Sequence, residues 1–142
     1  MRRVFAGLAT LLVLAVVAQF FLAASGAFST APNAESFEAH RALGYPIFAL
    51  AALMTVVAAV ARMPGRLIGM AGLIAGLFSL QVVIAMLARA FNGTGDTSTT
   101  AGQLVFGLHA INGLIILGAA GRVARQALAL SKSAVPDQPV GA

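Results

Sequence analysis

The chain has only two histidines, and both belong to the same short motif. The motif reads F-x-x-H-x-x-x-G, and its two copies are formed by Phe37, His40 and Gly44 and by Phe106, His109 and Gly113. An imidazole nitrogen binds transition metals, transfers protons near neutral pH and forms hydrogen bonds. The repeated motif therefore contains the first candidates for chemistry in this sequence.

A matching glutamine precedes each histidine motif. Gln19 is followed by three apolar residues and Ala23, and Gln81 is followed by three apolar residues and Ala85. In both cases a polar segment separates the glutamine from the histidine motif. Two motifs repeated in the same order indicate an internal repeat, with residues 4–62 and 67–125 as two copies of one helical hairpin.

Helical spacing places the phenylalanine, histidine and glycine of each motif on one face, because positions i−3, i and i+4 are neighbours on a helix. In an up-and-down bundle of four helices, the second and fourth helices are diagonal neighbours. His40 and His109 are therefore expected to face each other across the bundle axis.

Two opposed imidazoles predict a haem b site, because a six-coordinate haem iron takes one histidine nitrogen from each side. In this interpretation His40 and His109 are metal ligands, and a glycine one turn after each leaves room for the edge of the flat macrocycle. Arg41 and Arg89, at the outer ends of their helices, would pair with the haem propionates. The other residues of the predicted site are Gly44, Gly113, Phe37, Phe106, Gln19 and Gln81.

Other interpretations of the same residues stay open. In one interpretation, the two glutamines and two histidines form a polar layer that only ties the helices together. In another, they hold a different ligand, such as a metal ion or a quinone. The glycines then allow close packing of helices in lipid, and the two phenylalanines are core or interface aromatics.

The composition indicates that these residues belong to a membrane protein. Of 142 residues, 60% are hydrophobic and 9% are charged, and the mean hydropathy is +0.95, whereas a soluble protein has about a quarter charged residues. Apolar faces must therefore contact lipid. The length allows one domain, residues 1–130, followed by a disordered tail, residues 131–142. The absence of cysteine excludes disulfides, iron–sulfur clusters and covalently attached haem.

Four apolar stretches are long enough to cross a bilayer, which takes roughly 20 residues. They are residues 4–24, 43–61, 67–88 and 104–120. A basic turn with Pro64 and Gly65 joins the second stretch to the third, and longer polar segments, 25–36 and 92–100, form the other connections. The predicted fold is an all-α, up-and-down four-helix bundle in a membrane.

The distribution of cations predicts the orientation in the membrane. Arg41 and Arg89 fall on one side of the predicted spans, and the other side holds Arg2, Arg3, Arg62, Arg66, Arg122, Arg125 and Lys132. Because cytoplasmic loops are enriched in arginine and lysine, both termini are expected in the cytoplasm, with the spans in a bacterial plasma membrane. The first span also resembles a secretory signal peptide, since small residues up to Ala27 follow its apolar run, so its cleavage stays open.

Depth in the membrane is predicted from the rise of 1.5 Å per residue. Gln19, Gln81 and His109 come out about 20 to 24 Å from the nearest cytoplasmic arginine, in the outer half of the membrane. His40 comes out about 33 Å away, at the outer boundary, unless its helix tilts or kinks at Pro46.

Sequence patterns disfavour several classes of function. The basic residues form no stripe with interleaved aromatics, which argues against nucleic-acid binding. The sequence has no Ser/His/Asp set, carboxylate pair, phosphate-binding loop or zinc spacing, and no span has a charge at its middle. Hydrolysis, phosphoryl transfer and transport are therefore not expected, and neither is enzyme activity by this chain alone.

Two functions are expected instead. The first is a b-type cytochrome-like protein for one-electron transfer or haem handling, with a quinone or a redox protein as partner. The second is a structural or accessory subunit of a larger membrane complex, in which the Gln/His layer fixes the helices. A homodimer stays open, because small residues line several helix faces.

Histidines on the second and fourth helices of a membrane bundle resemble the paired haem ligands of membrane b-type cytochromes and the histidine bundle of haem A synthases. The resemblance covers the four spans, and it implies haem binding at His40 and His109 beside Gly44 and Gly113. Those families usually hold two haems, whereas this chain has histidines for one. The strings His-Arg-Ala-Leu-Gly-Tyr and Leu-His-Ala-Ile-Asn-Gly-Leu also look like a family of small four-span actinobacterial membrane proteins with no assigned function.

Overall fold

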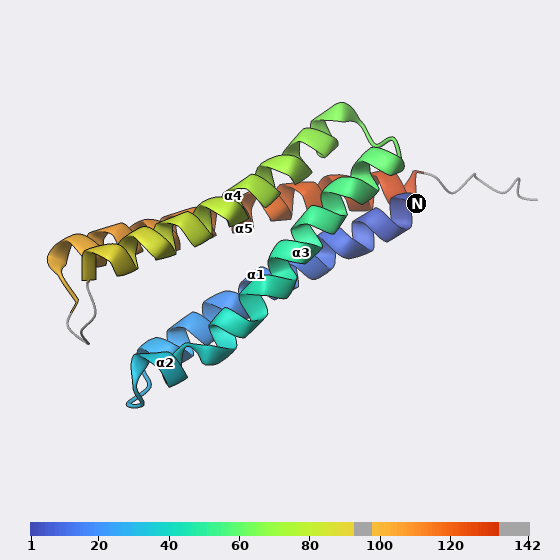
Figure 1. The fold of residues 1–142 in the computed structure, drawn as a ribbon. Helices are drawn as coiled ribbons and strands as arrows, with labels where there is room; N and C mark the ends of the chain where they lie inside the picture. Colours follow the sequence, from blue (N-terminus) through green and yellow to red (C-terminus); the bar gives the residue numbers. More distant parts are fainter. Residues whose placement is uncertain (93–97, 134–142) are drawn as a thin grey trace, which may run out of the picture.

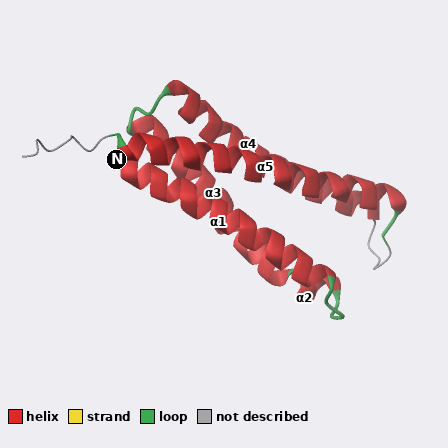
Figure 2. Cartoon of the chain, turned by 180° about the vertical axis from the view of Figure 1, so that it is seen from behind, coloured by secondary structure: helices red, strands yellow, loops and turns green. Residues whose placement is uncertain are grey.

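The protein is a bundle of helices, seen here in a computed structural model that describes residues 1–92 and 98–133 (Figure 1). In these two segments the secondary structure is helical and no strand is present (Figure 2). The helices are α1 (Arg2–Ala27), α2 (Asn33–Ser36), α3 (Glu38–Val60), α4 (Gly65–Asn92) and α5 (Thr100–Lys132). Four of them, all except α2, are long and apolar enough to cross a membrane. The predicted all-α four-helix membrane bundle is confirmed.

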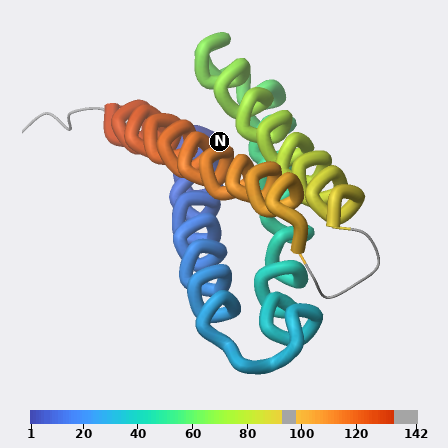
Figure 3. The backbone as a smooth tube through the Cα atoms, turned by 90° about the vertical axis from the view of Figure 1, so that its left-hand side faces the viewer, coloured from blue at the N-terminus to red at the C-terminus, as the bar shows by residue number. Residues whose placement is uncertain are grey.

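The four long helices close into a ring. α1 packs against α3 and α5, and α4 packs against the same two helices, so α3 and α5 are diagonal neighbours as predicted. Figure 3 shows the α1–α3 hairpin and the α4–α5 hairpin as two separate pairs that cross. The hairpins lie together at the end that holds the N-terminus and diverge toward the opposite end (Figure 1). The bundle is therefore closed at its basic end and more open at the end with α2.

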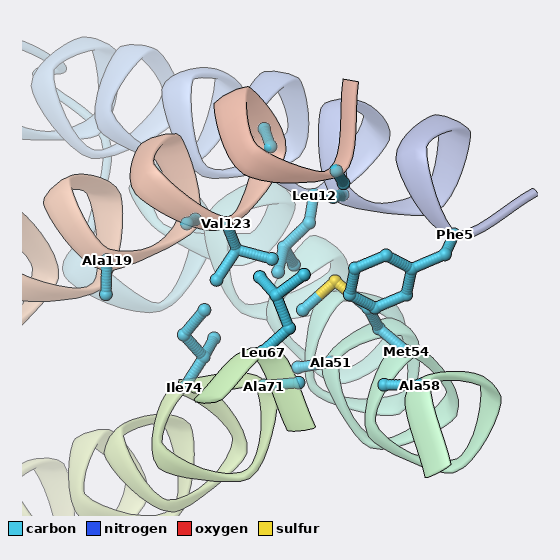
Figure 4. Packing of buried hydrophobic residues seen from close by; sticks show 14 of the residues in the cluster. Phe5, Leu12, Ala51, Met54, Ala58, Leu67, Ala71, Ile74, Ala119 and Val123 are labelled. Atoms are coloured by element: carbon cyan, nitrogen blue, oxygen red, sulfur yellow. The ribbon is translucent and has the colours of Figure 1, made fainter. Parts of the chain in front are cut away.

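Small and large apolar side chains alternate in the core at the closed end. Phe5, Leu12, Met54 and Ile74 are fully buried and pack among alanines of α3, α4 and α5, as Figure 4 shows. Alanines let helix backbones approach closely, which is how helices gain van der Waals contact where lipid is as apolar as the core. The helices of both hairpins contribute to one hydrophobic cluster.

The C-terminal end of α1 packs tightly against the α2 segment. A Cβ atom at Gly26 would lie 2.6 Å from the backbone oxygen of Ser36 and 3.0 Å from the ring of Phe37. Only glycine fits this contact without a shift of the backbone. The run of small residues that resembles a cleavage site therefore has a packing role in the folded bundle.

Every long helix has more residues than its predicted apolar stretch. α5 reaches Lys132, although the predicted span ends at residue 120, because arginine and lysine continue a helix as well as apolar residues do. The helix also runs two residues past the predicted domain boundary at residue 130, and most of the predicted tail lies outside the described residues. The expected connection 25–36 is partly helical, since it includes the last turn of α1 and all of α2.

The predicted basic turn between the second and third spans is present, but the chain reverses at Arg62, before Pro64 and Gly65. Arg62 has a φ of 50°, the left-handed conformation that usually requires glycine. The amide of Met63 donates to the carbonyl of Ala58 at 3.0 Å, and the amide of Arg62 donates to the carbonyl of Ala59 at 3.0 Å. These two bonds form a Schellman motif, which ends α3. Pro64 then accepts hydrogen bonds from the first turn of α4.

Candidate functional site

The two histidines lie opposite each other, one on each diagonal helix. The centres of the His40 and His109 rings are 6.2 Å apart, and the ring planes are inclined by 57°. Both side chains are partly buried. The structure thus brings together the two candidate ligands that come from different copies of the motif.

Each histidine ring is oriented by the helix that carries the matching glutamine. Nδ1 of His40 donates to the backbone carbonyl of Gln19 at 3.1 Å, since a carbonyl can only accept. The backbone carbonyl of Gln81 is the corresponding neighbour of His109, but no described residue forms a hydrogen bond of normal geometry with its buried Nδ1 atom. In both copies the backbone of the glutamine is therefore the neighbour of the imidazole.

The glutamine side chains fill the space next to the two glycines. A Cβ atom at Gly44 would lie 3.3 Å from Nε2 of Gln19, and a Cβ atom at Gly113 would lie 3.6 Å from Nε2 of Gln81. Gly113 also accommodates the ring of Phe20, 3.2 Å from the same position. The equivalent contacts in both hairpins match the repeat in the sequence. The room that was expected for the edge of a macrocycle is taken by these side chains.

Asn112 is a polar residue of the site that the motif comparison missed. It is 4% exposed, and its Nδ2 atom donates to the Gln81 side chain at 2.8 Å and to the backbone carbonyl of Leu77 at 2.9 Å. The first copy of the motif has Leu43 at this position, so a search for shared residues passes over it. The signal that identifies it is an amide side chain within an apolar span, where such groups need a partner.

We call Gln19, His40, Gln81, His109 and Asn112 the polar layer. Three of its buried atoms have no hydrogen-bond partner among the described residues: Oε1 of Gln19, Nδ1 of His109 and Oδ1 of Asn112. Buried polar atoms are nearly always paired in folded proteins. The polar layer therefore retains hydrogen-bonding capacity that the described side chains do not use.

Aromatic rings flank the two histidines. The Phe106 ring is stacked parallel to that of His109, with centres 5.2 Å apart, and the Phe37 ring meets that of His40 edge-on at 6.5 Å. Phe106 is 50% exposed on the outer surface of its helix. The phenylalanines of the motif therefore restrict their histidines from one side, as their spacing predicts.

In the described segments the two predicted propionate partners form no hydrogen bond with the polar layer. Arg41 donates a hydrogen bond to the backbone oxygen of Ala34, which links α3 to α2. Arg89 is exposed in the last turn of α4. No hydrogen bond within residues 1–92 and 98–133 joins either arginine to a histidine or a glutamine of the layer.

The two histidines share one level although their predicted depths differ. His40 is 20 residues from the end of α3 at Val60, and His109 is 23 residues from the end of α5 at Lys132. At 1.5 Å per residue these lengths are about 30 and 35 Å. The predicted depth of His109 depends on Arg122 as the end of the fourth span, whereas α5 continues for ten more residues.

No group of three or more histidine, cysteine, aspartate or glutamate side chains that could hold a metal ion occurs in the described part of the chain. The two histidines are therefore the complete set of strong protein ligands near the polar layer. A metal ion bound there would need further ligands from another molecule.

The fold and its apolar surface define a membrane-spanning protein with four long helices. Residues 19–89, which are 71 of the 142 residues and thus half of the chain, match the Family of unknown function (DUF6220). The chain belongs to this family. The match agrees with the expected resemblance to small four-span membrane proteins of no assigned function. No curated protein and no solved structure matches the chain, so the resemblance to cytochromes has no support from these comparisons.

Proposed function

We propose that this protein binds one haem b between His40 and His109 and serves in one-electron transfer or haem handling. The observation that carries the proposal is the separation of the two rings, 6.2 Å between centres. Two imidazoles bonded at about 2.0–2.1 Å to opposite sides of one metal ion have ring centres roughly 6.4 Å apart. The two distances agree closely.

The ligand set favours haem over a bare metal ion. Structural zinc sites use four protein ligands, and the polar layer offers two. A porphyrin supplies four equatorial nitrogens itself, so that its iron needs only two axial ligands from the protein. The haem iron would cycle between its ferric and ferrous states and carry one electron.

The surroundings of His40 also suit an axial ligand. A ligating histidine commonly donates its second ring nitrogen to a backbone carbonyl, which fixes the tautomer and makes the other nitrogen a stronger ligand. His40 has this arrangement with Gln19, and Nε2 is then the nitrogen left for a metal. The stacked ring of Phe106 restricts the orientation of the His109 ring. For the macrocycle to enter, the glutamine and Phe20 side chains next to the two glycines have to change rotamer.

The seven cations at the closed end favour an orientation in which that end, with both termini, faces the cytoplasm and the helices span a bacterial plasma membrane. The polar layer then lies toward the outer face, where a quinone in the membrane or a redox protein would exchange electrons with the site.

A structural role for the polar layer is the second candidate function. It is favoured by the hydrogen bonds from Asn112 to Gln81 and Leu77, which tie α5 to α4 without any cofactor. In this case the chain is an accessory membrane subunit, alone, as a homodimer or within a larger complex.

An optical titration separates the two functions. We expect purified protein to take up one haem per chain and to show a sharp reduced α-band, which His40→Ala and His109→Ala each remove. His109→Met supplies a different axial ligand and should keep the haem with a raised reduction potential, because Met/His ligation raises it. Thr55→Ala, a polar change in α3 whose hydroxyl bonds only within its own helix, serves as the control and should bind haem normally.

Two results would contradict haem binding. One is a folded protein that takes up no haem from solution. The other is an unchanged spectrum in both alanine variants, since the haem would then be held elsewhere. Circular dichroism of each variant shows whether the bundle has folded, so that a loss of haem can be assigned to the ligand.

A further inference from the structure

A groove runs along the outer face of the seam between α4 and α5, starting at the basic end of the bundle. Two shallow, open cavities of about 300 and 350 Å³ lie along it. The first is lined by Pro64, Arg66, Leu67, Gln126, Ala129 and Leu130. The second continues deeper and is lined by Met70, Leu73, Ile115, Gly118, Ala119 and Arg122.

The lining residues recur every three or four positions along each helix, so they form one continuous face. Leu73, Ile115 and Gly118 are exposed on this face. A Cβ atom at Gly118 would meet no atom within 4 Å, which means that the groove is open at its deeper half. Nothing in the described chain covers this apolar channel.

One cation, Arg122, lines the second cavity of this channel. Gln126 and Arg66 both line the first cavity. Arg122 precedes Gln126 by four residues, or about 6 Å along α5, and therefore lies farther from the basic end of the bundle. Side chains of an α-helix tilt toward its N-terminus. α5 begins at the opposite end of the bundle, so the Arg122 side chain tilts toward the membrane centre, where it lines the cavity with Ile115 and Gly118.

Cationic side chains beside an apolar surface between transmembrane helices attract anionic lipid head groups. The described residues at this end of the bundle include no acidic side chain, since Glu35 and Glu38 both lie at the opposite end. Two guanidinium groups, Arg66 and Arg122, therefore line the apolar channel, and no acidic side chain among the described residues lies beside them.

We propose that the groove binds an anionic phospholipid from the leaflet at the basic end. The phosphate lies between Arg66 and Arg122, and one acyl chain follows Leu73, Ile115 and Gly118 toward the middle of the membrane. Basic pockets between transmembrane helices bind anionic head groups in this way. The site is on the opposite end of the bundle from the polar layer, so the proposal does not depend on haem binding.

Native mass spectrometry of the full-length protein tests the proposal. The protein is released from detergent with equal amounts of phosphatidylglycerol and phosphatidylcholine, and the bound lipid is counted. We expect the wild type to retain phosphatidylglycerol, and the Arg66→Gln/Arg122→Gln double variant to lose this preference roughly 25-fold, about 5-fold for each arginine. The matched control Arg2→Gln/Arg3→Gln removes the same charge from the same end on α1 and should keep the preference.

A second variant tests the apolar half of the site. Gly118→Leu places a side chain in the open groove without a change in charge, and leucine favours the helix more than glycine does. We expect this variant to fold as the wild type does and to bind less of both lipids.

Three outcomes would overturn the proposal. The first is equal loss of phosphatidylglycerol in the two double variants, which would make net charge the only cause. The second is displacement of phosphatidylglycerol by glycerol phosphate at the same concentration as the lipid, because glycerol phosphate has no acyl chains. The third is a dimer that Gly118→Leu abolishes, because the groove would then bind a second copy of the chain.

Discussion

At the scale of single residues, the two halves of the chain differ most at Asn112. This amide is buried, and it holds α5 to α4 through Gln81 and the carbonyl of Leu77. In the first hairpin the equivalent Leu43 forms no such bond, and Oε1 of Gln19 has no partner among the described residues. The second hairpin therefore has an amide contact between its helices that the first hairpin lacks.

Replacing this amide with its counterpart from the first copy tests its contribution. We expect Asn112→Leu to lower the free energy of unfolding by about 1 kcal/mol, because hydrogen bonds between membrane helices contribute about 0.6 kcal/mol each. Unfolding by denaturing detergent, followed by circular dichroism, measures the change. A double-mutant cycle with Gln81→Leu should give a coupling of about 0.6 kcal/mol. Strictly additive losses would show that the two amides do not interact.

The sequence identifies most residues of the site but not all of their contacts. Repetition picks out both histidines, both glutamines and both glycines, since a residue kept at matching positions is visible without a structure. Asn112 occurs once, so repetition cannot mark it. Helical spacing also places a glutamine and a histidine near each other, but it does not determine whether the side chain or the backbone makes the contact.

At the scale of elements, the turn between α3 and α4 contains an avoidable strain. Arg62 adopts the left-handed conformation at the end of α3, which costs a non-glycine residue about 1–2 kcal/mol. Glycine adopts it without a steric penalty but loses more freedom on folding. The charge of Arg62 contributes to the basic end of the bundle, which is a reason for an arginine at a position that favours glycine.

Substitution of this residue should stabilise the purified protein. We expect Arg62→Gly to raise the free energy of unfolding by up to about 1 kcal/mol. The control is Arg66→Gly, in the first turn of α4, where the backbone is right-handed and glycine should lower the free energy by about 0.5–1 kcal/mol. The same detergent unfolding experiment compares the two variants. A loss of stability in Arg62→Gly would contradict the assigned strain.

The number and order of the long helices can be predicted from apolar stretches, but their ends cannot. A hydropathy criterion stops at the first charges, whereas the backbone hydrogen bonds of α5 continue past Arg122 and Arg125. Helix α2 has only four residues, which is too short to produce a helical period in the sequence. The predicted and observed helices differ most at their ends, because caps and turns, rather than lipid contact, determine where a helix ends.

At the scale of the whole molecule, the cations divide the bundle into two unlike ends. The ends of α1 and α5 and the α3–α4 turn carry seven of them, and the end with α2 carries the other two, Arg41 and Arg89. The sequence predicts this polarity and the diagonal placement of α3 and α5. It does not predict that the hairpins diverge, because that angle depends on how the side chains of four helices pack together.

The absence of cysteine makes the orientation directly measurable. We expect a Thr30→Cys variant to react with a membrane-impermeant thiol reagent in intact cells, because residue 30 lies between α1 and α2 at the end with few cations. Ser133→Cys, just after α5, should react only after the cells are broken. Labelling of both variants in denaturant controls for reactivity, and the reverse pattern would place the termini outside the cell.

The seam between α1 and α5 is packed like the other three seams, yet no loop connects these two helices. The start of α1 and the end of α5 also lie at the same end of the bundle as the α3–α4 turn (Figure 1). A circularly permuted chain, opened at that turn and joined between α5 and α1, would therefore have the same four seams in a different order along the chain. In that chain the α4–α5 hairpin would come first and the α1–α3 hairpin second, while the same helix faces would meet.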